Sequence, residues 1–155
     1  MDYFSGDTIV AVATSLAGDG GVGIIRLSGP KSMAISQKFT RGFEKPNPRF
    51  LHRIEVIKNQ EVIDDGLAVY FAKEASFTGE EVVELQIHGG RFLLQEILKL
   101  LISSGECRMA LPGEFSFRSV KNNKMSLNQA QAIAQLVKAK SQYETWSARQ
   151  NISGN

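Results

Sequence analysis

Several residue types that build stabilising or metal-binding sites are scarce in this sequence. There is one cysteine, Cys107, which excludes an internal disulfide bond and a zinc site built from cysteines. The formal net charge is +2, so the chain has no strong electrostatic footprint for DNA or RNA. No apolar run reaches the ~20 residues that span a bilayer, and the first residues lack the basic region of a signal peptide. We therefore expect a cytoplasmic protein without a membrane segment.

The residues that are present are typical of a folded domain with its own core. The chain has 155 residues, of which 43% are hydrophobic and 22% are charged. A chain of this length buries roughly 68–70% of its unfolded surface, which is enough for a core without disulfide bonds or metals. A disordered protein is excluded, because its apolar content would be lower.

The apolar pattern predicts an α/β (α+β) protein with a mixed sheet. Short alternating or β-branched segments predict strands over Thr8–Thr14, Val22–Ser28, Phe50–Ile57, Val62–Ala72 and Glu81–His88. Lys58-Asn-Gln60 suggests a hairpin turn between the third and fourth of these. Apolar residues at helical spacing predict helices that start at Gly29-Pro30, cover Arg91–Ser104, start near Pro112 and cover Leu127–Asn151.

The last predicted helix begins with a capping-box pattern, Ser126 followed by Gln129. Its apolar stripe must be buried on the body of the protein, on a missing domain or on a second subunit, because no later segment covers it. The stripe consists of Ala130, Ile133, Ala134, Val137, Tyr143 and Trp146.

Two charged residues lie in the middle of predicted strands. Val83 and Leu85 share one face of their strand, and Glu84 lies on the other face with His88. Arg26 lies similarly inside an apolar strand. A solvated outer face is the ordinary explanation for such a carboxylate. If these charges are buried they need partners, which could be each other or a polar ligand.

The nucleotide-binding motifs are incomplete. Gly18–Gly23 matches G-x-G-x-x-G, but a dinucleotide site needs a helix after the motif, and here a strand follows. The alternatives are a glycine hairpin and a loop that a ligand approaches closely. In Ser28–Ser32 a proline interrupts the Gly-Lys-Ser adjacency of a Walker A motif. We therefore expect this chain neither to bind nor to hydrolyse GTP.

Metal and catalytic sites are not predicted. The two histidines, His52 and His88, are too few for a multi-histidine site, and the pair Glu84 and His88 is more typical of a surface network. No serine, histidine and aspartate pattern suggests a nucleophile. Cys107 is expected to be a small residue that is buried or half-buried.

Several segments together resemble, in this order along the chain, the N-terminal part of the tRNA-modification GTPase family MnmE (also called TrmE). No single segment would suffice, but jointly they are specific and cover nearly the whole chain. They are Gly20–Gly29, Ser76–Glu80, Val83–Gly90, Leu111–Arg118, Asn123-Lys124 and Gln129–Ile133.

This resemblance implies a fold, a ligand and partners. Residues 1–120 would form a folate-binding and dimerisation domain, similar to the tetrahydrofolate-binding domain of the glycine-cleavage T protein, and 121–155 would begin a helical domain. The family's folate-contacting residues fall on Arg26, Glu84 and Lys124, with 5-formyltetrahydrofolate as the ligand. Family members form homodimers and act with a flavoprotein, MnmG (GidA), on C5 of the wobble uridine of certain tRNAs. Their GTPase domain, which uses GTP, Mg²⁺ and K⁺, is absent here, so we interpret the chain as an N-terminal fragment.

The sequence departs from the family pattern at several positions. Asp19 lies where the glycine loop usually carries an arginine, and Ser126 and Gln131 replace an aspartate and a glutamate. These departures concern loop contacts more than the pocket.

Two other functions stay open. The chain could be a stand-alone one-carbon (aminomethyl) transferase like the glycine-cleavage relatives, although no acid/base constellation stands out. It could also be a structural adaptor without a ligand, in which Arg26 and Glu84 form an internal salt bridge.

Overall fold

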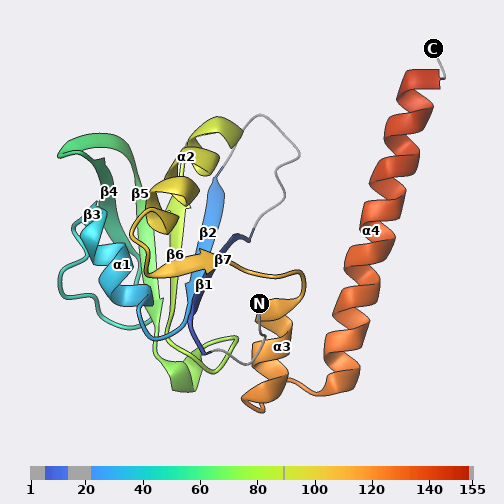
Figure 1. The fold of residues 1–155 in the computed structure, drawn as a ribbon, viewed down its shortest axis with the longest axis horizontal. Coiled ribbons are helices and arrows are strands. Elements are labelled where there is room, and N and C mark those ends of the chain that lie inside the picture. The colour runs from blue at the N-terminus through green and yellow to red at the C-terminus, as the bar shows by residue number, and fades with distance from the viewer. Residues whose placement is uncertain (1–5, 14–21, 89, 154–155) are drawn as a thin grey trace.

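The computed structural model describes residues 6–13, 22–88 and 90–153 (Figure 1). In this part of the chain seven strands form one sheet in the order β3-β4-β5-β6-β2-β1-β7. Neighbouring strands are antiparallel except β1 and β7, which are parallel. The mixed sheet with packed helices confirms the predicted α/β class. The strands are β1 Thr8–Val12, β2 Gly23–Ser28, β3 Thr40–Arg41, β4 His52–Lys58, β5 Glu61–Phe71, β6 Val82–Ile87 and β7 Cys107–Met109.

The helices follow the predicted order. Besides a short 3₁₀ turn, η1, at Lys73–Ala75, the described residues form α1 Ser32–Lys38, α2 Arg91–Ile102, α3 Glu114–Lys121 and α4 Leu127–Ser153. The predicted start of α1 at Gly29-Pro30 is wrong by two residues. Gly29 has a φ of 133° and its N–H donates to the carbonyl of Glu81, so this residue still belongs to the turn that leaves the sheet.

The predicted strands are confirmed with slightly different ends. The hairpin between β4 and β5 turns at Asn59 and Gln60, whose φ values of 51° and 66° are those of the primed turns that join antiparallel strands. β2 begins at Gly23, so the G-x-G-x-x-G pattern leads into a strand as expected. Residues 14–21, which include Asp19 and most of that pattern, lie outside the described residues.

Two short strands were not predicted. β3 pairs with β4 at the edge of the sheet, and β7 pairs with β1 from Cys107 to Met109, where no strand was expected. Segments of two or three residues are too short to show a period of two, so only their partner strands define them.

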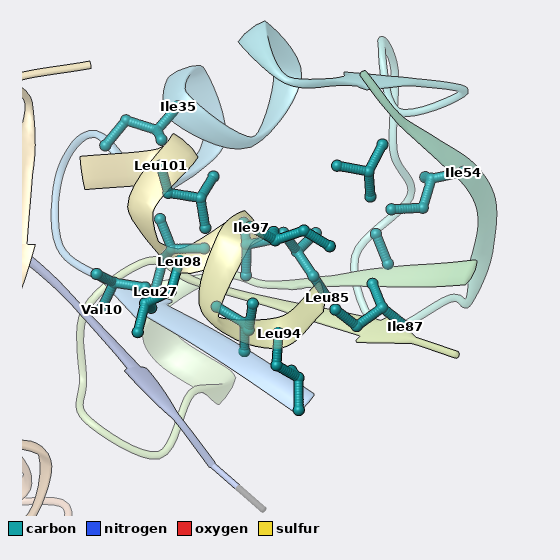
Figure 2. Close-up of a cluster of buried hydrophobic side chains, with 14 of the residues drawn as sticks. Val10, Leu27, Ile35, Ile54, Leu85, Ile87, Leu94, Ile97, Leu98 and Leu101 are labelled. Atoms are coloured by element: carbon teal, nitrogen blue, oxygen red, sulfur yellow. The ribbon is translucent and has the colours of Figure 1, made fainter. Parts of the chain in front are cut away.

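The core lies between one face of the sheet and the helices α1 and α2 (Figure 2). The alternating residues of β6 that were assigned to one face are all buried, as predicted. Because side chains alternate along a strand, the residues between them lie on the opposite face, away from α2. The cluster includes Val10, Ile25, Leu27, Ile35, Leu85, Ile87, Leu94, Ile97, Leu98 and Leu101.

The helices α3 and α4 continue the chain beyond this core. The capping box is confirmed: the Ser126 N–H donates to Gln129 Oε1 at 2.9 Å, and the Gln129 N–H donates to Ser126 Oγ at 3.1 Å. From there α4 extends away from the sheet, joined to it through α3 (Figure 1). Trp146, Ile133 and Leu136 are exposed on α4. The predicted domain boundary at residue 120 stays a prediction.

Among the described residues, no helix is both long enough and apolar enough to span a bilayer.

Candidate functional site

Arg26 and Glu84 form an ion pair in the middle of the sheet. Strands β2 and β6 are antiparallel neighbours, and their register places Arg26 directly opposite Glu84. Arg26 donates from Nε at 3.0 Å and from Nη2 at 2.8 Å, and both bonds end on Glu84 Oε1. The two side chains are half-buried, with 28% and 17% of their surfaces exposed. The prediction that these charges could pair with each other is confirmed.

The second carboxylate oxygen of Glu84 is not used in this pair. Among the described residues no side chain or backbone group donates a hydrogen bond to Oε2. A half-buried carboxylate oxygen of this kind can accept a hydrogen bond from water or from a ligand. The pair therefore neutralises the charge of Glu84 while half of its accepting capacity stays available.

Two aromatic rings that the sequence reasoning missed contact this pair. The Arg26 guanidinium carbon lies 5.8 Å from the centroid of the Phe77 ring and 5.9 Å from that of the Phe115 ring. Phe77 follows η1 in the loop before β6, and Phe115 is in the first turn of α3. Both lie in segments that carry the family resemblance, but neither segment has a periodic signal that would assign the rings to Arg26.

Lys124, the third predicted site residue, lies after α3 against the loop that contains Phe77. Its Nζ donates to the carbonyl of Glu74 at 2.6 Å, and its side chain packs close to Gly79. In the described residues it makes no hydrogen bond or ion pair with Arg26 or Glu84. The structure thus brings Arg26 and Glu84 into contact. It places Lys124 against the loop that contains Phe77, which contacts Arg26.

A partly buried cluster of five charged residues anchors α3 to the sheet. Arg118 is 2% exposed and Glu114 is fully buried. Arg118 donates to Glu114 Oε2 at 3.2 Å, to Glu80 Oε1 at 3.0 Å and to Asp7 Oδ1 at 3.1 Å. Arg108 donates to the same Glu114 at 2.7 Å and to Asp7 at 2.7 Å. The cluster joins α3 to β7, to the start of β1 and to the loop before β6.

The charges and hydrogen bonds of this cluster favour the ionised form of the Glu114 carboxylate. Burial alone would raise the pKa of Glu114. The hydrogen bonds from Arg108 and from the Leu111 N–H, together with the charges of both arginines, outweigh burial and lower this pKa below its ordinary value. Glu114 is therefore a charged structural residue rather than a proton donor at neutral pH.

His88 contacts Asp64 and Asp65, whereas the sequence suggested Glu84 as its acidic neighbour. Its backbone N–H donates to Asp64 Oδ2 at 3.0 Å, and its Nδ1 is 3.4 Å from Asp65 Oδ1. The three side chains offer ligand atoms within 4.8 Å of one another, so they could hold a divalent cation. Asp64 and Asp65 were missed because they lie on β5, and only the pairing of β5 with β6 brings them to His88.

Cys107 is half-buried, as predicted. Burial raises the pKa of its thiol to about 11, so the group stays protonated and poorly nucleophilic at neutral pH.

Comparison with known proteins identifies the family of this chain. A family model described as "GTP-binding protein TrmE N-terminus" matches residues 8–124. The chain belongs to this family. The matched range covers most of the chain and contains Arg26, Glu84 and Lys124. The predicted resemblance is confirmed.

Several curated relatives of this TrmE N-terminal chain carry the name "tRNA modification GTPase MnmE". The protein of Marinomonas sp. (strain MWYL1) is 48% identical over 149 residues, which is 96% of this chain and 32% of that protein. That of Coxiella burnetii (strain Dugway 5J108-111) is 42% identical over 154 residues, 99% of this chain and 33% of that protein. That of Francisella tularensis subsp. novicida (strain U112) is 41% identical over 152 residues, 98% of this chain and 33% of that protein. The chain thus spans about a third of the length of these relatives.

Proposed function

We propose that this chain is the formyltetrahydrofolate-binding and dimerisation module of a GTPase that modifies C5 of the wobble uridine of tRNA. Membership of the TrmE N-terminal family supports this role, because the named relatives are tRNA modification GTPases. In this proposal GTP, Mg²⁺, K⁺, the tRNA and the flavoprotein MnmG (GidA) act with the parts of the relatives that this chain does not span.

The observation that carries the folate proposal is the half-buried pair of Arg26 and Glu84. A pterin ring presents adjacent N–H donors along one edge, and a carboxylate accepts such donors in strong, charge-assisted hydrogen bonds. Glu84 has an oxygen that accepts nothing from the described residues. The folate tail carries carboxylates, for which Arg26 or Lys124 is a suitable cation.

The same ion pair also supports the adaptor alternative. Arg26 and Glu84 satisfy much of each other's charge, as an internal salt bridge without a ligand would. The two functions differ in one measurable property, because only the folate-binding module binds a pterin.

Calorimetric titration of 5-formyltetrahydrofolate into the chain tests this difference. We expect saturable binding, and much weaker binding of p-aminobenzoylglutamate, which has the tail but not the pterin. No heat of binding at millimolar ligand would overturn the folate proposal and favour the adaptor. Conversion of the folate during the titration, followed by its absorbance, would favour the one-carbon transferase.

Dimerisation is the second part of the proposal. Leu136 and Trp146 expose large apolar side chains on α4, and exposed apolar patches commonly mark interaction surfaces. We expect light scattering to give about twice the 17.1 kDa mass of one chain. Leu136→Glu should shift the protein toward monomer if α4 forms the contact, whereas Phe50→Ser, an exposed apolar position in the loop before β4, should not. A monomeric mass at high concentration would contradict the prediction.

A further inference from the structure

The guanidinium of Arg26 is held by three residues from three different segments. Glu84 accepts two of its hydrogen bonds, and the rings of Phe77 and Phe115 lie 5.8 Å and 5.9 Å from its central carbon. Both distances fall within the roughly 6 Å over which a cation is attracted to an aromatic face. Arg26 therefore has little of the rotamer freedom that an exposed arginine has.

The segments that carry the two rings are joined by hydrogen bonds that do not involve Arg26. The Ser119 hydroxyl on α3 donates to the Phe77 carbonyl at 2.6 Å, and Asn122 Nδ2 donates to the Thr78 carbonyl at 2.8 Å. These bonds join the loop of Phe77 to the helix of Phe115. The buried Arg118 bonds this helix to Glu80 of the same loop, and Glu80 accepts a hydrogen bond from Ser28 on β2. The fold thus holds the two segments that carry the rings together, and the rings restrict the arginine.

We propose that Phe77 and Phe115 are positioning residues of the ligand site. They hold Arg26 so that it takes one oxygen of Glu84 and leaves the other to the ligand. The inference rests on the proposed folate function and deepens it. It assigns two further residues to the site, which act through Arg26. Preorganising a charged group in this way increases affinity, because its ordering cost is met during folding rather than on binding.

Replacing either ring by leucine tests the proposal, because leucine keeps apolar volume and removes the aromatic face. We expect Phe77→Leu and Phe115→Leu each to weaken 5-formyltetrahydrofolate binding about 2- to 5-fold, the size of an exposed cation–π contact. Phe77→Tyr and Phe115→Tyr keep a ring and should bind as the wild type does. Phe50→Leu is the matched control and should change nothing, since Phe50 is exposed and precedes β4, which β5 and β6 separate from β2.

The decisive measurement is a double-mutant cycle with Arg26→Ala, read by ligand-detected NMR so that millimolar dissociation constants are reached. If the rings act through Arg26, replacing Phe115 or Phe77 by leucine causes no further loss once Arg26 is alanine. An equal further loss in that background would overturn the proposal, because the rings would then act directly or through general stability. Phe77 lies on a loop, so its variant also covers the case in which Phe115→Leu does not fold.

Failure of the positioning proposal can be distinguished from failure of the folate proposal. If the wild-type chain binds no folate, the proposed function fails, and the same cycle is measured on urea unfolding. Coupling between Phe115 and Arg26 in that cycle supports the positioning contact without any ligand. Additive effects on unfolding would overturn it.

Discussion

Arg118→Met is expected to lower the free energy of unfolding by about 3–5 kcal/mol, the usual cost of removing one partner from a buried ion pair. Arg118 bonds to three carboxylates and is 2% exposed, and Glu114 beside it is fully buried. Without Arg118, Arg108 is the one cation left in the cluster to face Asp7, Glu80 and Glu114. Methionine fills similar space but cannot neutralise those charges, so the loss is electrostatic rather than a cavity effect.

Urea denaturation followed by far-UV circular dichroism measures this loss. Arg118→Lys keeps the charge but not the forked donors, so it should fall between the wild type and Arg118→Met. Arg53→Met is the matched control: Arg53 is 86% exposed, and its ion pair with Asp65 is 3.9 Å long, so we expect a change of less than about 1 kcal/mol. An Arg118→Met stability equal to that of the Arg53 variant would show that the cluster does not stabilise the fold.

The strands that carry the site were predictable from the sequence, but the contact between them was not. Alternation along 82–87 correctly assigned Glu84 to the face opposite the core, and the β-branched pattern placed Arg26 in a strand. Their pairing depends on the order of strands in the sheet. In that order β2 lies next to β6, although 53 residues lie between Ser28 and Val82 in the sequence. No local pattern encodes that order.

The buried charges were missed for a related reason. Glu114 and Arg118 are four residues apart on α3, a spacing that normally indicates an exposed helical ion pair. They are buried because Asp7, Arg108 and Glu80 arrive from three other segments and satisfy them. The sequence shows the helix, whereas burial of its charged face follows from tertiary packing. Lys124 is exposed, and its contact with the Glu74 carbonyl likewise follows from tertiary packing.

Glu84→Ala is expected to have the largest effect on ligand binding. A charge-assisted hydrogen bond contributes roughly 1.5–3 kcal/mol, so affinity for 5-formyltetrahydrofolate should fall about 10- to 100-fold. The same change removes the partner of Arg26, whose 28% exposure allows water to replace it, so the stability cost should be small beside the binding cost. Calorimetric titration and urea denaturation of the same variants separate the two effects.

The pattern across a series of variants distinguishes a binding carboxylate from a structural one. Glu84→Gln should bind more tightly than Glu84→Ala but less tightly than the wild type, because an amide has a single accepting oxygen and no charge. Arg26→Lys should also bind less tightly than the wild type, because lysine lacks the planar fork that bonds to Glu84 at Nε and Nη2. Glu55→Ala, an exposed carboxylate in the middle of β4, should bind as the wild type does. If wild type binds folate and Glu84→Ala binds it equally well, the ion pair is an internal salt bridge and the pterin must be recognised elsewhere.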